Sequence, residues 1–470
     1  MYRYIVPAAA WLSLCAPLAA AAAPNEDLSD IRNEIDALKR AYESRIKELE
    51  DRLNKAETQV EENRDDLATV EREAPSAGSQ TRPNAFNPAL SVILQGSVNS
   101  YSQNPDTYAL PGFQLGGEAG LAKEGMTLDE TEITASANID QLFYGQSTFA
   151  VHQDEDGTEL EIEEAYVDTL ALPAGLGGRF GRFYSDIGYL NQMHSHTWDF
   201  HDQPLAYEAF LGSQYRDDGV RLTWTLPTDL YVMLGAETLA GDSFPAGESE
   251  NVLGDVQTLF MKLGGDIGVS SAWQGGLSAL SADVHDRASG GHHHDGDEES
   301  GSVFSGDSDL YIADFVYKWA PDGNPTQRNF KFQTEFFYRH EKGNVTYTEA
   351  ADSALLAYNG DQMGWYAQAI YQFVPRWRVG FRYDWLSSDN DLSVTDLGGF
   401  TDPNEVIEES GLDSNGYDPQ RWSVMVDWNP SEFSRIRAQY NRDESRPDEP
   451  DNQWTLQYIM SLGSHGAHLF

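Results

Sequence analysis

The feature that most constrains the fold is a regular alternation of apolar and polar residues in the C-terminal half of the chain. In residues 454–462 every second residue is apolar, and Thr455, Gln457 and Ser461 stand on the other parity. Because successive side chains of a β-strand point to opposite faces, this pattern predicts a strand with one apolar and one polar face. The alternation recurs, with charged residues on the second face, in residues 311–319, 330–339, 377–385, 421–428 and 435–440.

An apolar face beside a charged face indicates a barrel in a membrane, because a soluble sandwich turns its apolar faces towards each other. Membrane barrels have short turns on the periplasmic side and long loops on the outside. Here short turns alternate with long polar stretches; the turns are at residues 173–175, 227–229, 374–376 and 429–431, and the stretches at 103–125, 187–207, 285–307, 342–359 and 387–415. The spacing predicts an all-β transmembrane barrel of about 16 antiparallel strands over residues 87–470, with 14 or 18 as alternatives.

The N-terminal part differs in character from the barrel. Residues 1–23 have the basic start, apolar run and small-residue end of a secretory signal peptide. Apolar residues at steps of three and four predict an α-helical coiled coil over residues 24–73. It would lie in the periplasm and self-associate, for instance as a homotrimer; the alternative is a single charged helix. Residues 74–86, rich in Ser, Gly and Pro, are expected to form a flexible linker.

The composition limits which classes of partner are compatible with the chain. The formal net charge of -45 argues against nucleic acid and favours attraction of cations. Aromatic residues make up 12% of the chain, which suits a barrel that contacts outer-membrane lipid through aromatic girdles. The single cysteine, Cys15, falls in the signal peptide, so a metal would be held by His, Asp or Glu.

One short stretch stands out as a candidate metal site. It contains three histidines and two aspartates, namely His194, His196, Asp199, His201 and Asp202. An extended His-x-His segment places both imidazoles on one side of the backbone, and nearby carboxylates can complete a metal shell for zinc or another divalent ion. The alternative is a polar loop whose histidines bond to neighbouring carboxylates. The strand count places the stretch in the third extracellular loop.

A second candidate is the run His292, His293 and His294, which is flanked by carboxylates in the expected fifth extracellular loop. Consecutive histidines on a flexible segment bind zinc, copper or nickel with little geometric selection. The run would act as an outer antenna for metal, or it is a low-complexity loop with incidental affinity.

The polar face of the C-terminal strands is rich in arginine. Residues expected to line the pore are Arg378, Arg382, Asp384, Arg421, Asp427, Arg435 and Arg437. A row of arginines opposite carboxylates sets up a transverse field and suits an anionic chelate. Alternatively, these arginines pair with Asp384 and Asp427 across neighbouring strands.

The motifs resemble those of a known family. The opening NAFNPALSVIL (residues 84–94), the GYLN and HSHTWDF segments of the His-rich stretch, and the ending LGSHGAHLF are similar to the siderophore-porin family, whose members are also labelled zinc-regulated outer-membrane receptors. More distantly the chain is similar to phosphate-selective porins. The resemblance implies a passive channel for scarce metals, as free ion or chelate. In 16-stranded porins the third loop folds into the barrel, which would place the candidate metal ligands in the channel.

Together these features predict an outer-membrane channel for zinc or iron, as the ion or as a siderophore complex, with no obligatory cofactor. A general diffusion porin or a structural outer-membrane protein is the alternative. We expect no enzymatic activity, because no Ser or Cys nucleophile motif accompanies His201 and Asp202. Adjacent residues of a strand also point to opposite faces.

Overall fold

The computed structural model describes residue 47 and residues 88–116, 119–153, 158–251, 254–289, 300–447 and 449–463. The predicted signal peptide, coiled coil and linker lie outside the described residues, as do His292, His293, His294 and Phe470. Those predictions, and the domain boundaries that depend on them, stay predictions.

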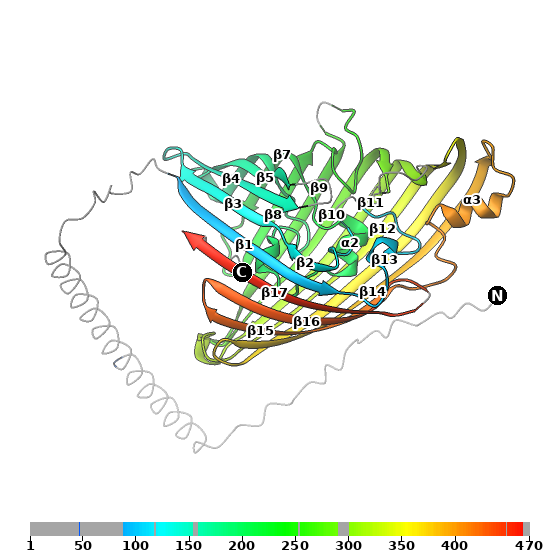
Figure 1. Ribbon diagram of the computed structural model, residues 1–470. Helices are drawn as coiled ribbons and strands as arrows, with labels where there is room; N and C mark the ends of the chain where they lie inside the picture. The colour runs from blue at the N-terminus through cyan, green and yellow to red at the C-terminus, as the bar shows by residue number, and fades with distance from the viewer. Residues whose placement is uncertain are drawn as a thin grey trace, which may run out of the picture. The chain divides into compact units, whose positions relative to one another are not determined.

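One antiparallel sheet of 17 strand segments makes up the described part of the chain (Figure 1). The segments are β1 (Ala89–Ser100), β2 (Gly125–Leu128), β3 (Thr131–Asn138), β4 (Phe143–Gln153), β5 (Thr158–Thr169), β6 (Leu176–Tyr184), β7 (Arg216–Thr225), β8 (Tyr231–Leu239), β9 (Val256–Ile267), β10 (Ser271–Ala288), β11 (Ser300–Trp319), β12 (Asn329–Glu349), β13 (Asp352–Val374), β14 (Trp377–Asp396), β15 (Gln420–Ser431), β16 (Ser434–Glu444) and β17 (Asp451–Gly463). Both β2 and β3 pair with β1, each segment from β3 onwards pairs with the next in the sequence, and β1 pairs with β17, which closes the barrel.

Two of the segments are one interrupted strand. Both β2 and β3 pair with β1, where Gly96 faces Leu128 and Ile93 faces Glu132. The break between them falls at Asp129 and Glu130, and the register shifts there by one residue. Counting β2 and β3 together gives a closed barrel of 16 antiparallel strands, as the alternation and the turn lengths predicted.

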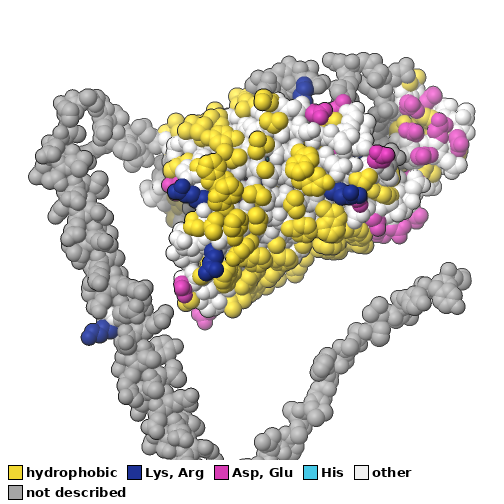
Figure 2. Space-filling view, turned by 60° about the horizontal axis from the view of Figure 1, so that its bottom comes forward, with side chains coloured by type: hydrophobic (Ala, Val, Ile, Leu, Met, Phe, Trp, Pro, Cys, Tyr) yellow, Lys and Arg dark blue, Asp and Glu magenta, His cyan; other side chains and the backbone are white. Residues whose placement is uncertain are grey.

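The two faces of the wall differ as expected for a barrel in lipid. On β17 the side chain of Trp454 is 61% exposed on the outside, while Thr455 is 8% exposed on the inside. Figure 2 shows apolar side chains spread over the outer wall, whereas acidic side chains gather at the end where Figure 1 places α3. An apolar exterior around a polar interior is the arrangement that a bilayer stabilises.

The turns at residues 173–175, 227–229 and 374–376 are confirmed, but other expected connections are wrong or too long. The strands β10 and β11 extend into the expected loop 285–307, and β14 extends into the expected loop 387–415. Residues 429–431 belong to β15, and the turn follows them. Residues 342–359 are not a long loop, because β12 and β13 continue as paired strands and turn at residues 350–351. Along these extensions the inward residues are apolar, such as Val345, Tyr347 and Leu356, and they pack against other loops. In these extensions the apolar residues face inward, which is the reverse of the membrane-spanning part. The alternation expected of a membrane barrel therefore did not predict them as strands.

Short helices lie in the connections. They are η1 (Pro105–Thr107), η2 (Pro173–Gly175), η3 (Ser195–Thr197), α2 (Leu205–Leu211), η4 (Pro321–Gly323) and α3 (Pro403–Glu409). None of the helices in the described segments has the length and apolarity needed to cross a membrane. All seven residues of α2 are buried, and Gly212, with a φ of 61°, ends this helix in the left-handed conformation that glycine adopts readily.

An apolar cluster fills part of the barrel interior. The ring of Phe210, in α2, is 5.6 Å from Phe113, which follows β1, and is stacked at 5.6 Å on Phe337 of β12. Leu110 and Tyr207 are buried in the same cluster. The connections after β1 and β6 are therefore folded inside the barrel and narrow its lumen.

A candidate metal site and a loop anchor in the barrel lumen

The β6–β7 loop, residues 185–215, crosses the lumen from one wall to the other. On one side Gln95 Nε2 of β1 donates a hydrogen bond of 2.7 Å to Ser195 Oγ. On the other side the carboxylate of Glu335 in β12 accepts hydrogen bonds from the backbone nitrogens of Tyr189, at 2.9 Å, and Leu190, at 3.2 Å. The loop is thus held inside the barrel by side chains of distant strands.

The base of this loop is closed by one side chain. Asn191 Nδ2 donates to the carbonyl oxygens of Ser185, at 2.7 Å, and Tyr215, at 2.9 Å. Its Oδ1 accepts a hydrogen bond of 2.8 Å from the Tyr215 nitrogen. Because these groups are buried, the bonds fix where the loop enters and leaves the lumen.

The histidines of the loop meet a group of carboxylates that we call the acidic wall. Its residues lie on or next to β3 and β5, and they are Asp129, Glu130, Glu132, Glu163 and Glu164. His194 Nδ1 lies 3.2 Å from Glu132 Oε2 and 3.4 Å from Glu163 Oε2, and its Nε2 lies 3.1 Å from Glu164 Oε2. His196 Nδ1 is 2.7 Å from Glu132 Oε1.

Three of these groups have the arrangement of a metal shell. One ligand atom each of Glu132, Glu163 and His194 lies within 4.8 Å of the others. A tetrahedral shell with bonds of about 2.1 Å has ligand atoms about 3.4 Å apart. The distances from His194 Nδ1 to both carboxylates are close to that value.

Two atoms of this group lack hydrogen bonds. Both His194 Nδ1 and Glu163 Oε2 are buried and have no hydrogen-bond partner among the described residues. The other Glu163 oxygen accepts a hydrogen bond from the hydroxyl of Tyr184. Burial lowers the pKa of His194, but the nearby carboxylates of Glu132, Glu163 and Glu164 raise this pKa well above its ordinary value. The site therefore attracts positive charge, which a proton or a metal ion can supply.

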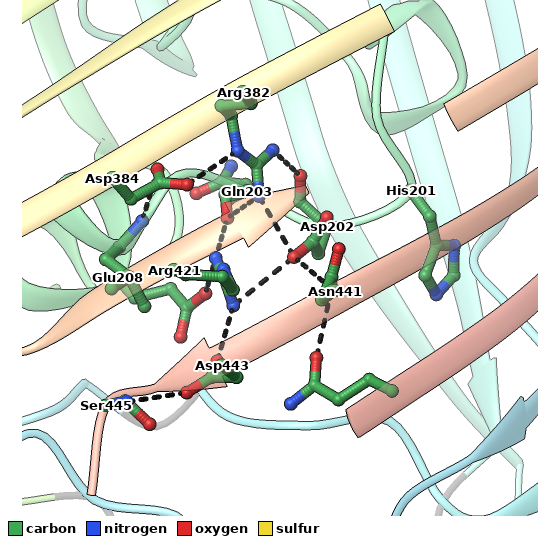
Figure 3. Close-up of polar contacts among 12 residues, drawn as sticks. His201, Asp202, Gln203, Glu208, Arg382, Asp384, Arg421, Asn441, Asp443 and Ser445 are labelled. Atoms are coloured by element: carbon green, nitrogen blue, oxygen red, sulfur yellow. Dashed lines mark hydrogen bonds and ion pairs between the residues drawn. The ribbon is translucent and has the colours of Figure 1, made fainter. Parts of the chain in front are cut away.

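The aspartates of the same stretch point to a different place, which we call the basic wall. It consists of cationic residues on β12 and β14–β16, namely Lys331, Arg378, Arg382, Arg421, Arg435 and Arg437. Asp199 contacts Lys331 Nζ at 3.0 Å and Arg378 Nη1 at 2.9 Å. Asp202 lies between Arg382, at 3.0 Å, and Arg421, at 3.2 Å (Figure 3). Four of the five expected metal ligands are thus divided between the two walls.

The basic wall also pairs with its own carboxylates. Asp427 pairs with Arg378 and, at 2.9 Å, with Arg437. Arg382 contacts Asp384 at 2.9 Å. The Asp427 pairs are the cross-strand pairs that the sequence offered as the alternative, whereas Arg382 and Asp384 lie on the same strand, β14. Both kinds of pair coexist with bonds to the loop, such as that from Arg435 to the Trp198 carbonyl oxygen at 3.0 Å. Burial raises the pKa of Asp202, but Arg382 and Arg421 hold it well below its ordinary value.

His201 belongs to neither group of close ion pairs. Its Nδ1 is 3.9 Å from Asp129 Oδ2, and the residue borders a polar cavity of about 190 Å³.

A second group of three potential metal ligands consists of His285, Asp255 and Asp283. The expected antenna residues that follow His285 lie outside the described part.

Sequence reasoning missed the carboxylates of the acidic wall. The available signal was the density of acidic residues in the segments 129–132 and 161–164. Their strands carry a weak alternation because β3 follows a break and β5 contains a bulge opposite Thr148 and Phe149. The pattern therefore did not show which of these residues face the lumen.

Comparison with solved structures finds outer-membrane proteins at low similarity. The anion-selective porin from Comamonas acidovorans is 8% identical, with a TM-score of 0.47 over 80% of this chain and 99% of that one. The outer membrane channel DcaP of Acinetobacter baumannii is 12% identical, with a TM-score of 0.46 over 80% and 97%. The loop L8 deletion mutant of OmpT of Vibrio cholerae is 9% identical, also with a TM-score of 0.46, over 81% and 100%.

No protein-family model matches the sequence. An uncharacterized protein of Aquifex aeolicus (strain VF5) is 31% identical over an alignment of 411 residues, and the alignment covers 82% of this chain and 80% of that protein. Since the alignment extends over four fifths of both proteins at this identity, the chain belongs to the same family as the Aquifex aeolicus protein.

Proposed function

We propose that this protein is a porin-like channel of the outer membrane that takes up a divalent transition-metal ion, zinc in the first place, through its lumen. The observation that carries the proposal is the group formed by His194, Glu132 and Glu163. In this group His194 of the loop that narrows the lumen meets Glu132 of β3 and Glu163 of β5. The channel acts as a transporter and not as an enzyme, and it needs no resident cofactor.

The chemistry of the group supports zinc over the hard cations. One imidazole nitrogen with two carboxylate oxygens is a donor set that zinc, copper or nickel accepts, whereas magnesium and calcium prefer oxygen ligands alone. The two buried atoms without hydrogen bonds, His194 Nδ1 and Glu163 Oε2, would gain a partner when an ion binds. The strongly negative net charge raises the local concentration of cations at the entrance.

The size of the cavities beside the β6–β7 loop supports a free ion or a small complex over a siderophore. The two polar cavities beside the β6–β7 loop have volumes of about 190 and 250 Å³. Pockets for drug-sized molecules have volumes of roughly 300 to 1,000 Å³. A siderophore complex would therefore require the loop to move.

The test is single-channel conductance of the purified protein in planar bilayers with added zinc. Micromolar zinc should block or modulate the wild-type current, and magnesium at the same concentration should not. In the double variant His194→Gln/Glu163→Gln, the zinc concentration that gives half of the block should rise at least about tenfold. Loss of a residue that only supports a metal ligand already lowers metal affinity by about that factor. His340→Gln is the matched control, since His340 pairs with Asp361 at 2.9 Å and is half-exposed.

The second candidate is a general diffusion porin. The observation that favours it is that Glu132 already pairs with both His194 and His196 without an ion. This candidate predicts that wild type and the double variant conduct identically with and without zinc, and that result would end the metal proposal.

A further inference from the structure

A second group of metal-binding side chains lies where the β8–β9 loop meets the outer end of β10. It consists of His285, Asp283 and Asp255, whose ligand atoms all lie within 4.8 Å of one another. Asp283 and His285 are two residues apart on β10, so both point to the same side of the strand. Val284 between them is buried in the apolar cluster of the interior, so these two side chains face away from the lumen.

The backbone of the β8–β9 loop holds Asp255 beside the other two side chains. The Glu248 nitrogen donates a hydrogen bond of 2.7 Å to the His285 carbonyl oxygen. The Asp283 nitrogen donates one of 3.0 Å to the Asp255 carbonyl oxygen. The carboxylate of Asp255 itself accepts a hydrogen bond of 2.7 Å from the backbone nitrogen of Glu250. Carboxylates that bind a metal are commonly oriented by such bonds, so Asp255 is already placed for this role.

The imidazole of His285 has a carboxylate near each ring nitrogen. Its Nε2 lies 3.6 Å from Asp283 Oδ1, which is close to the ligand separation of about 3.4 Å in a tetrahedral shell. Its Nδ1 lies 4.0 Å from Glu250 Oε2. A histidine that binds a metal through one nitrogen usually donates the N–H of its other nitrogen to a carboxylate or a similar acceptor. The arrangement therefore suits an ion at Nε2, with the Glu250 carboxylate on the side of Nδ1.

Solvent reaches this group, and its charge attracts cations. The side chain of Asp283 is 58% exposed and that of His285 is 26% exposed. With Asp255 and Glu250, three carboxylates surround one imidazole, so the group is negative at pH 7 whether His285 is neutral or protonated. A divalent cation between these carboxylates relieves their repulsion. An imidazole nitrogen with carboxylate oxygens is a donor set that zinc, nickel or copper accepts.

We propose that His285, Asp283 and Asp255 form a second binding site for a divalent transition-metal ion, on the outer surface of the extracellular end of the barrel. The site is separate from the group at His194 and does not depend on transport through the lumen. Because it faces the medium, its ion exchanges without passing the β6–β7 loop.

The experiment is a zinc titration of the full-length protein in detergent, by isothermal titration calorimetry, in a background without the other candidate ligands. This background carries His194→Gln/Glu163→Gln, which removes the lumen group, and His292→Ala/His293→Ala/His294→Ala, which removes the histidine run. One zinc ion per chain should still bind. Absence of binding would mean that the group is a surface ion pair only, and it would overturn the proposal. Conductance tests the lumen group separately, because zinc block of the current should persist in His285→Gln.

Single substitutions in this background locate the ion. Asp283→Asn and His285→Gln should each weaken zinc binding at least about tenfold. Two matched controls should bind zinc as the background does. Glu248→Gln removes an exposed charge of the same loop, and His340→Gln removes a half-exposed histidine that pairs with Asp361. Zinc should raise the unfolding temperature in the controls and not in Asp283→Asn or His285→Gln.

A comparison in the otherwise unchanged chain does not depend on the folding of the multiple variant. There the wild type should bind one zinc ion more than His285→Gln does. Equal numbers of bound zinc ions, or zinc binding in the background that survives both Asp283→Asn and His285→Gln, would show that the ion is held elsewhere and would contradict the assignment.

Discussion

The two walls of the lumen hold the same loop in different ways. At the basic wall, each carboxylate of the loop meets cations at hydrogen-bond distance, and Asp202 also accepts a bond of 3.1 Å from Asn441 Nδ2. At the acidic wall, several buried atoms have no hydrogen-bond partner within the described residues; they are Asp129 Oδ2, Glu130 Oε1, Glu163 Oε2, His194 Nδ1 and His201 Nδ1.

This difference separates a structural role from a binding role. At the basic wall the carboxylates of the loop are paired with cations, although the Nε atoms of Arg378 and Arg421 have no hydrogen-bond partner within the described residues. A buried carboxylate paired in this way stabilises a unique position of the loop, and removing one partner leaves the other charge uncompensated. A group with surplus negative charge and unused lone pairs is stabilised when a cation arrives. We infer that the basic wall anchors the loop, whereas the acidic wall carries the metal site proposed above.

The largest effect should follow from Asp202→Asn, which removes the charge between Arg382 and Arg421. We expect the free energy of unfolding to fall by about 3 to 5 kcal/mol, as is typical when a buried pair is broken on one side. Thermal or denaturant unfolding in detergent measures this change, and protease cleavage in residues 185–215 reports release of the loop. A loss below about 1 kcal/mol would show that the anchor lies elsewhere.

A pH-dependent effect of similar size should come from Glu208, which lies beside Arg421. Burial raises the pKa of Glu208 from 4.5 to about 7, although Arg421 opposes this shift. Because the folded protein favours the protonated acid, the stability from this group is complete below pH 4.5 and is lost as pH rises through about 7. The stability lost between these two pH values corresponds to about 3 kcal/mol of the free energy of unfolding. Unfolding of wild type and Glu208→Gln at several pH values should show this slope only in wild type, and parallel curves would refute the assignment.

The fold could be predicted largely from the sequence, because lipid selects a repeating pattern. Alternation on β14–β17 gave the inward and outward faces correctly, including Arg382 and Trp454. The pattern failed where lipid no longer selects it. In the hairpin extensions beyond the membrane, Val345 and Leu356 face an interior packed with loops, so apolar residues point inward.

The candidate site could be predicted only in part. The spacing of His194 and His196 indicated a site, but local spacing cannot reveal partners that are far away in the sequence. Glu132 and His194 are brought together by barrel closure and by the path of the loop. For the same reason Asp199 and Asp202, which are neighbours of the histidines in sequence, were expected to join them and instead contact the basic wall.

Glu163→Gln should have a smaller effect on stability than Asp202→Asn. Glutamine still accepts the hydrogen bond from Tyr184, and the change removes one of several crowded negative charges. We expect the free energy of unfolding without metal to change by about 1 kcal/mol or less. Zinc affinity, measured by titration calorimetry, should fall at least about tenfold. A loss of stability as large as that of Asp202→Asn would mean that both walls are anchors.

The smallest effect should come from the outer end of β16, the strand whose inward residue Asn441 binds Asp202. There Arg442 contacts Glu444 at 2.7 Å, but the Arg442 side chain is 51% exposed. An exposed pair is screened by solvent and contributes about 0.2 to 1 kcal/mol, so Arg442→Gln should shift unfolding only slightly, and less at high salt. Denaturant unfolding at low and high salt tests this. Arg442→Gln could instead lower the free energy of unfolding as much as Asp202→Asn does. Burial of a charge would then not distinguish an anchor from a surface pair, and the contrast between the two walls would have to rest on the number of partners around each charge.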